Sequence, residues 1–171
     1  LDPVHSNVSF AVRHMLVSNV RGTFATFSGT ATGDPANPSG AVIEATIDAA
    51  SIDTKDAKRD AHLKNPDFLD VAKYPTITFK SKKIAPAGAG KFAVTGDLTL
   101  HGVTKEVVLD VVGPTAVVKD PFGNTRAGAS ATTKIDRKDF GVSWSKNMDG
   151  GGLVVGDEIT ITIDVEATLK P

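Results

Sequence analysis

Histidines and neighbouring acidic residues are the side chains of this sequence that could bind a metal ion or act in acid–base catalysis. The four histidines, His5, His14, His62 and His101, lie far apart along 171 residues. Asp60 and His62 offer two metal-ligand types two positions apart, but the charged segment around them is typical of a solvated helix. No spacing assembles a nucleophile, a base and an orienting group. We therefore expect no catalytic residue and no metal site.

Other motifs of catalysis and cofactor binding are missing from the sequence. There is no cysteine, which excludes disulfides, thiolate zinc sites, cysteine nucleophiles and iron–sulfur clusters. The run Gly88-Ala89-Gly90-Lys91 resembles a phosphate loop, but no Ser or Thr follows and a strand pattern begins there, which is typical of a hairpin turn. The run Gly141-Val142-Ser143-Trp144 does not satisfy the nucleophile-elbow pattern. We expect no cofactor of a catalytic kind.

Net charge and the lengths of the apolar runs argue against two further classes of protein. The formal net charge is -1, whereas binders of nucleic acid or anionic membranes carry a basic excess. No apolar run approaches the roughly 18 residues of a membrane-spanning helix, so we expect no stable membrane insertion. The length and the lack of a linker predict one domain over residues 1–171.

The elements that would position any site are β-strands. Val, Ile and Thr number 19, 9 and 18, and apolar and polar residues alternate in most segments, most clearly over 159–169. Turn residues separate the runs, which predicts antiparallel hairpins. Phe24 and Phe27 would point to opposite faces of one regular strand, although both are apolar, which indicates a bulge between them. One helix is predicted within residues 53–70, capped by Asp53 or Thr54 and ended by Pro66.

Two strand faces built from alanine suggest room inside the predicted barrel. Because protein interiors pack densely, walls of small residues must be filled from opposite strands or must leave space for a ligand. Both outcomes are open from this pattern alone. The alanines concerned are Ala41, Ala45 and Ala49 in one run, and Ala127, Ala129 and Ala131 in another.

The chain resembles the YceI-like family of bacterial lipocalin-like proteins over nearly its whole length. The resemblance rests on short stretches that recur in the same order. They are residues 1–6 (LDPVHS), 10–15 (FAVRHM), 20–24 (VRGTF), 50–54 (ASIDT), 59–63 (RDAHL), 67–71 (DFLDV), 74–79 (YPTITF), 96–104 (GDLTLHGVT), 137–142 (RKDFGV) and 156–159 (GDEI).

The resemblance implies an all-β fold, an extended eight-stranded antiparallel lipocalin-like barrel with one short helix near an end. It implies a non-enzymatic protein that holds a long-chain lipid, such as a polyprenyl chain or an isoprenoid quinone, in an apolar tunnel for transport, storage or scavenging. Such proteins are often dimers. Some members are periplasmic and others have no evident leader. No leader is visible here, and we expect a periplasmic or secreted rather than a cytoplasmic location.

An isoprenoid tail needs a dry apolar wall, and alternation selects the residues that would line it. A polar head group would need donors at the mouth, for which His14, Arg21, Arg59 and Arg137 are candidates. The predicted ligand-binding residues are Val8, Phe10, Val12, His14, Phe24, Ile43, Ala45, Ile47, Ile77, Phe79, Phe92, Val94, Leu98, Leu109, Val111, Ala129, Trp144, Ile161 and Ile163.

Two other functions remain open from the sequence. A barrel enzyme acting on a small apolar substrate would place a polar cluster with perturbed pKa values deep in the cavity. A partner-binding β protein with a filled core would show no elongated cavity and an exposed apolar patch instead.

Overall fold

Alternating β-branched residues form eleven strands in the computed structural model, which describes residues 1–34, 36–149 and 151–170. One α-helix, α1 (Ala57–Lys64), and three short 3-10 helices, η1 (Pro38–Gly40), η2 (Ala49–Ser51) and η3 (Arg137–Phe140), complete the described elements. The strands are β1 (Asn7–His14), β2 (Ser18–Phe24), β3 (Phe27–Thr32), β4 (Val42–Asp48), β5 (Ile52–Asp53), β6 (Thr76–Gly88), β7 (Lys91–Leu100), β8 (Val103–Val112), β9 (Val118–Lys119), β10 (Thr125–Asp136) and β11 (Val155–Thr168).

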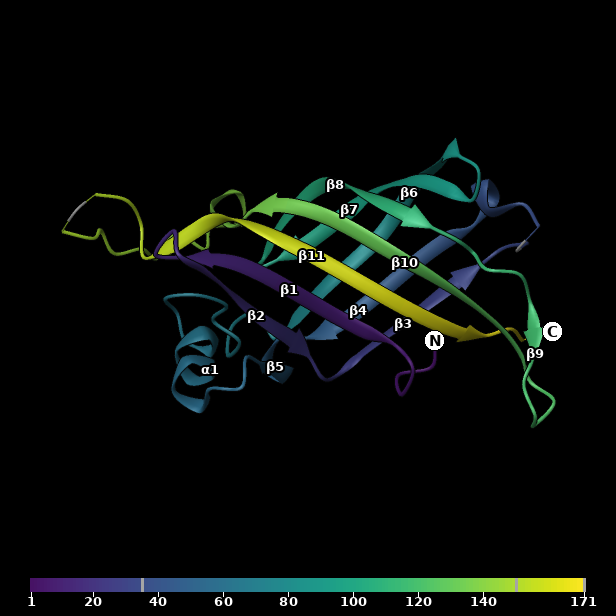
Figure 1. Ribbon diagram of the computed structural model, residues 1–171, viewed down its shortest axis with the longest axis horizontal. Helices are drawn as coiled ribbons and strands as arrows, with labels where there is room; N and C mark the ends of the chain where they lie inside the picture. The colour runs from purple at the N-terminus through teal and green to yellow at the C-terminus, as the bar shows by residue number, and fades with distance from the viewer. Residues whose placement is uncertain (35, 150, 171) are drawn as a thin grey trace.

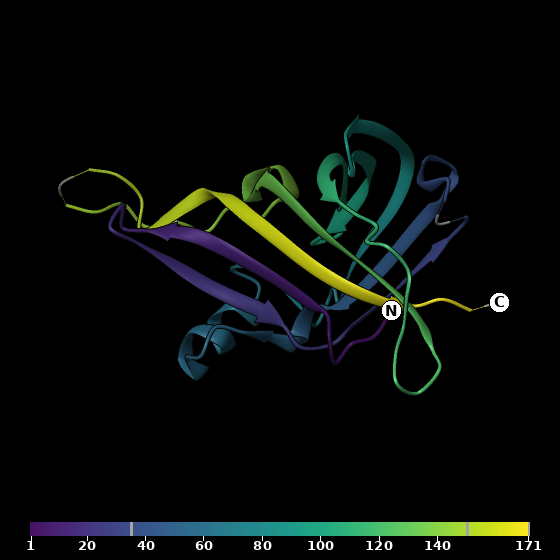
Figure 2. The same cartoon turned by 45° about the vertical axis from the view of Figure 1, so that its right-hand side comes forward.

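The strands form one curled antiparallel sheet. Its order is β3-β4-β6-β7-β8-β10-β11-β1-β2-β5, and β9 pairs with β10. β2 and β3 stand near opposite ends of this order, yet only Ala25 and Thr26 separate them in the chain. The sheet must therefore bend back toward its own beginning, and Figures 1 and 2 show the resulting elongated half-barrel.

The prediction of an all-β antiparallel fold with one short helix is confirmed, but the predicted count of eight strands is not. The chain forms a larger number of strands, several of them short. Phe24 and Phe27 end β2 and begin β3, at the position of the predicted bulge. The 3-10 helix η2 separates β4 from β5, which pairs with the end of β2 through Phe24 and Ile52. The two-residue strand β9 adds a further segment.

The helix α1 begins later than predicted. Its N-terminal cap is Asp56, whose side chain accepts hydrogen bonds from the backbone N–H groups of Lys58 and Arg59. Thr54, a predicted cap, is buried and instead donates its hydroxyl proton to Asp60. The helix ends at Lys64, two residues before Pro66, as predicted. It lies near one end of the sheet, whereas β9 and the chain termini lie near the other (Figure 1).

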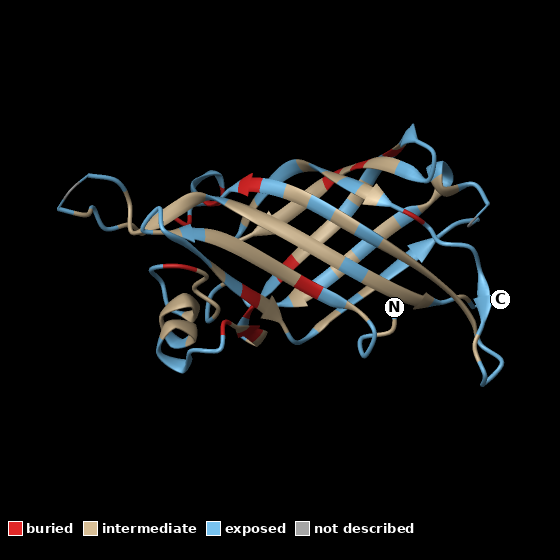
Figure 3. Ribbon diagram, viewed as in Figure 1, coloured by how far each residue is buried: buried red, intermediate tan, exposed pale blue. Residues whose placement is uncertain are grey.

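Few residues are fully buried in this fold. The buried apolar side chains are Val8, Ala49, Ile52, Phe68, Ile77, Ile84, Val94, Ile135, Phe140 and Val142. Figure 3 shows that most of the strand surface is of intermediate burial instead. Among the described residues, no helix is long and apolar enough to cross a membrane.

Candidate ligand-binding site

The predicted lining residues of the strands all fall on one face of the sheet, because directly paired residues point to the same side. Phe10 lies opposite Ile161 and Val8 opposite Ile163. The other pairs on this face are Val94 with Leu109, Phe92 with Val111, Leu98 with Phe79, Phe79 with Ala45, Ile77 with Ile47, Ala129 with Val165 and Val12 with Val20, and alternation adds Ile43 and Phe24.

This face is the sheltered side of the sheet, and we call it the inner face. In β4, the inner residues Ile43, Ala45 and Ile47 are half-buried. The alternate residues of the same strand, among them Glu44 and Thr46, are exposed. The alternation of polar and apolar residues therefore matches the two sides of the curl.

The inner face is sheltered but not filled. Of the predicted strand residues on it, Val8, Ile77 and Val94 are buried, and all the others are half-buried. Interior side chains of a packed barrel interdigitate and lose nearly all their accessible surface. Here most apolar side chains of the wall keep accessible area, as an apolar ligand site requires.

Two phenylalanine rings lie along the wall because the neighbouring strand offers glycine. A Cβ atom at Gly22 would lie 2.5 Å from Cζ of Phe10, and one at Gly96 would lie 2.5 Å from Cζ of Phe79. The Phe10 ring also lies 5.8 Å from that of Phe24, centroid to centroid. Each glycine thus lets a ring pack flat over the neighbouring backbone.

The alanine walls are partly as predicted. Ala45, Ala127, Ala129 and Ala131 are half-buried on the inner face of β4 and β10. These two strands are separated in the sheet order by β6, β7 and β8. Ala49 does not belong to the wall, because it lies in η2 and is buried.

Two of the four candidate head-group donors hold the backbone instead. Arg137 is only 3% exposed and donates hydrogen bonds to the carbonyl oxygens of Val142 and Trp144, at 2.7 Å each. It also donates to the carbonyl of Gly156 and to the Asp157 carboxylate. Arg59 donates from Nη2 to the carbonyl of Thr54 at 2.7 Å. Both guanidinium groups are structural.

The other two candidates lie in different places. Arg21 pairs with Ala11, and it is exposed on the outer side of the sheet. His14 is half-buried at the end of β1, opposite Val155, where the register with β11 shifts. His14 therefore stays a candidate at the mouth. Lys105 pairs with Leu98 on the inner face and is exposed. It is a further cation, which was not among the predicted head-group donors.

Trp144 lies beside α1, outside the strands. Its ring is 5.1 Å from that of His62 and 5.1 Å from that of Phe68, centroid to centroid. Nε2 of His62 in turn lies 2.8 Å from the Asp67 carboxylate. This aromatic cluster connects the loop after η3 to the helix near one end of the wall.

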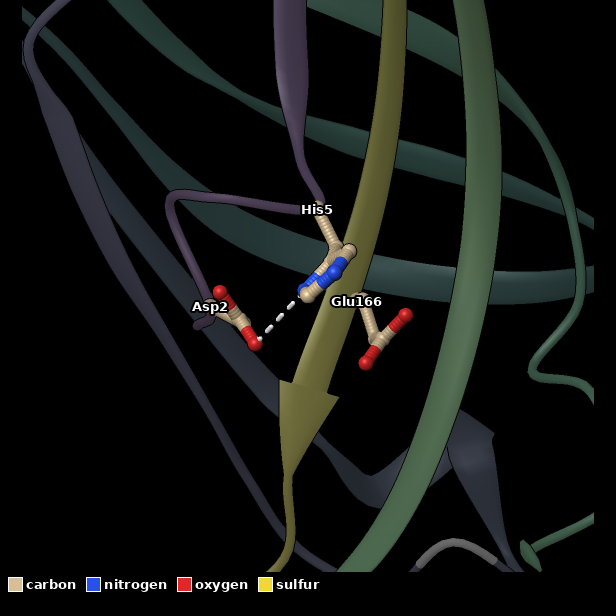
Figure 4. A group of neighbouring side chains, drawn as sticks. All are labelled: Asp2, His5 and Glu166. Atoms are coloured by element: carbon tan, nitrogen blue, oxygen red, sulfur yellow. Dashed lines mark hydrogen bonds and ion pairs between the residues drawn. The ribbon is translucent and has the colours of Figure 1, made fainter. Parts of the chain in front are cut away.

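At the opposite end, Asp2, His5 and Glu166 bring metal-ligand types together (Figure 4). Nδ1 of His5 lies 3.1 Å from the Asp2 carboxylate. The guanidinium of Arg126, however, binds Asp2 and Glu166 and also Asp120. Hydrogen bonds from Arg126 hold the pKa of Asp2 well below its usual range. Because the Arg126 guanidinium already binds these carboxylates, the cluster is an ion-pair network that ties the N-terminal segment to β10 and β11.

Two pockets on the described surface have charged rims, although the second also takes in Lys105, Val107 and Ile135 of the inner face. One, of about 350 Å³, is lined by Arg13, Asn19, Asp157, Glu158 and their neighbours on β1, β2 and β11. The other, of about 320 Å³, lies where β8 and β10 separate, and its lining includes Lys105, Glu106, Lys134, Asp136 and Asp139. Charged rims of this kind do not suit an apolar chain.

Comparison with known proteins decides the family. The sequence matches the YceI-like domain over residues 1–167. A UPF0312 protein of Vibrio cholerae is 41% identical over 140 residues, which cover 81% of this chain and 72% of that protein. The chain belongs to the YceI-like family. Its fold agrees, since BcnA of Burkholderia cenocepacia superposes with a TM-score of 0.84 at 31% identity, over 98% of this chain and 99% of that one.

A more distant structure shares the YceI-like fold. A domain from Saccharophagus degradans, described as a polyisoprenoid binding domain, superposes with a TM-score of 0.69 over 97% of this chain and 94% of that one. At 17% identity, this likeness shows the fold alone.

Proposed function

We propose that this YceI-like protein binds a long-chain isoprenoid or similar amphiphilic lipid along the inner face, in an apolar tunnel, for transport, storage or scavenging. A polyprenyl chain or an isoprenoid quinone has the required form, an extended apolar tail with one polar end. We further propose a periplasmic or secreted location and a homodimer, in line with the family resemblance.

The observation that carries the proposal is the half-buried apolar wall. Removing apolar surface from water is favourable by about 25 cal/mol per Å². A ligand that covers this accessible wall would therefore be bound with that free energy. The residues that would meet the tail are aliphatic or aromatic, among them Val12, Phe79, Leu109, Ile161 and Ile163. They impose no hydrogen-bond pattern, which suits a hydrocarbon tail.

The polar side chains of the inner face support binding rather than catalysis. Oγ of Ser81 accepts a hydrogen bond from the backbone N–H of Ile43 at 2.8 Å. Oγ1 of Thr133 donates to the carbonyl of Val108 at 2.8 Å. Both hydroxyls thus bind the backbone of a neighbouring strand, which is a structural role. His14 and Lys105 are the polar groups that we assign to the ligand's head.

The related fold of the Saccharophagus degradans polyisoprenoid binding domain supports the same ligand class. Its likeness to this chain concerns the fold, and the ligand is carried over here as a proposal. The accessible apolar wall is the independent physical reason for making it.

Titration of the delipidated protein with ligands of increasing chain length tests the function. Each added carbon that contacts the wall contributes about 0.8 kcal/mol, or roughly fourfold in affinity. We expect saturable binding that tightens with chain length and then levels off when the wall is fully covered. Affinity that does not depend on chain length, or no saturable binding, would contradict the proposal.

A further inference from the structure

We propose that the tip of the β1–β2 hairpin, residues Met15, Leu16 and Val17, docks on a lipid bilayer that contains anionic headgroups. The inference rests on the proposed function for its purpose, which is exchange of the ligand with a membrane.

The tip keeps bulky side chains where the backbone disfavours them. The N–H of Val17 donates to the carbonyl of His14 at 3.0 Å, which closes a turn. Both central residues have positive φ, +50° at Met15 and +60° at Leu16. A β-turn with positive φ at both central residues favours Asn-Gly there, because a Cβ atom is strained at positive φ. The strain at Met15 and Leu16 points to a use other than stability.

The same residues are exposed although they are apolar. Met15, Leu16 and Val17 are 44%, 65% and 79% exposed. The tip rests on the loop that precedes β11, because Met15 donates its N–H to the carbonyl of Val154 at 2.9 Å. A Cβ atom at Gly152 would lie 3.2 Å from Cδ1 of Leu16 and 3.1 Å from Cε of Met148. Met148 thus extends the apolar tip into that loop.

Positive charge flanks the tip. Nη2 of Arg13 donates to the carbonyl of Leu16 at 3.1 Å, which holds the guanidinium beside the apolar residues. Neither Arg13 nor Lys146 of the adjoining loop forms an ion pair with any residue that the structure describes. Asp157 and Glu158 line a pocket with Arg13, but their carboxylates pair with Arg137, Lys138 and Lys134. Asp149 is the acid of the adjoining loop. The net charge of -1 gives the whole molecule no attraction to an anionic surface, so the contact depends on this local arrangement. An apolar tip with cations behind it matches an anionic bilayer, where apolar groups enter the acyl boundary and cations meet phosphates.

The position of the tip also favours a bilayer over a protein partner. The hairpin lies near one end of the long axis in Figures 1 and 2, beyond the end of β1 that carries Val12 and His14, and the loop before β11 extends farther still at this end. A protruding tip needs a matching hollow in a protein, but a bilayer accepts it without one. Docking there would bring one end of the inner face to the membrane surface.

Vesicle co-sedimentation with a turn-repairing variant tests the inference. Met15→Asn combined with Leu16→Gly supplies the residues that the turn favours, so this variant is expected to fold with equal or higher Tm. We expect its binding to phosphatidylglycerol–phosphatidylcholine vesicles to fall by at least about tenfold, because two apolar side chains are lost. Phe122→Ser is the matched control, since Phe122 is 88% exposed at the other end of the molecule (near β9 in Figure 1).

The expected result is that the wild type binds these vesicles, that salt weakens binding, and that Phe122→Ser binds normally. The inference is overturned if the wild type does not bind, if the double variant binds as well as the wild type, or if Phe122→Ser loses binding equally. A change of oligomeric state in the double variant would assign the tip to a second copy of the chain and overturn it too. Ligand titration without vesicles tests the proposed function separately, since the double variant leaves the inner face intact.

Discussion

Replacing one alanine of the inner wall with tryptophan separates a hollow half-barrel from a filled one. Ala45 is half-buried on β4 and lies opposite Phe79 on one side and Gly29 on the other. Phe79 and Gly29 are themselves half-buried, so Ala45 lies beside residues that keep accessible surface. An indole at this position would occupy the space that we assign to the ligand tail.

The expected loss of affinity follows from the apolar contact that is displaced. If the indole excludes about five carbons of the tail, the loss is about 4 kcal/mol at about 0.8 kcal/mol per carbon. This corresponds to a fall of roughly a thousandfold in affinity. The free energy of unfolding should change little, because a hollow wall offers room for the ring.

Thr46→Trp is the matched control, since Thr46 is the next residue of the same strand and is exposed on the outer side. Ligand titration and chemical denaturation of the two variants provide the assay. We expect Ala45→Trp to lose ligand and keep its stability, while Thr46→Trp keeps both.

Two results would refute the reasoning. If Ala45→Trp loses about 1–3 kcal/mol of unfolding free energy or more, as overpacked cores do, the interior is filled. If Ala45→Trp binds ligand as tightly as Thr46→Trp, the wall has been placed wrongly.

Three further changes test the framework that holds the wall. Arg137→Met should cost about 3–5 kcal/mol of unfolding free energy in denaturant, because buried carbonyls lose their donors, whereas Arg21→Met should cost less than about 0.5. Arg126→Met should be less stable than the wild type by an amount that is constant at neutral pH and shrinks as pH falls below about 4. The reason is that Arg126 lowers the pKa of Asp2, and the stabilisation from this ion pair disappears when the Asp2 carboxylate is protonated. A stability difference that grows in acid would contradict this assignment. Gly96→Ala should lower Tm, since its Cβ would lie 2.5 Å from a backbone oxygen of β6, and an unchanged Tm would count against the close packing there.

The sequence was informative about the wall because strands have a side-chain period of two. Once Phe10 and Ile161 are assigned to one face, alternation and pairing place the remaining apolar residues of each strand on that face. The change of face between Phe24 and Phe27 was interpreted as a bulge, whereas the structure ends β2 and begins β3 there.

The roles of the arginines could not be predicted in the same way. Arg137 binds carbonyl oxygens of Val142, Trp144 and Gly156, and these meet only after the segment following η3 folds back beside β11. Arg126 likewise joins Asp2 to Glu166, residues distant in sequence. Gly22 and Gly96, which lie beside the rings of Phe10 and Phe79, had a local signal, since each interrupts the apolar face of a strand. Which ring each glycine meets depends on the register.

Mass spectrometry of the lipid extracted from folded, purified protein tests the central claim most directly. The account predicts a long-chain isoprenoid or similar amphiphile in nearly equimolar amount with the wild type and with Thr46→Trp, and its loss from Ala45→Trp. Extracts of wild-type protein that contain no such lipid, together with no binding when the lipid is added back, would contradict the claim that the inner face is a lipid site.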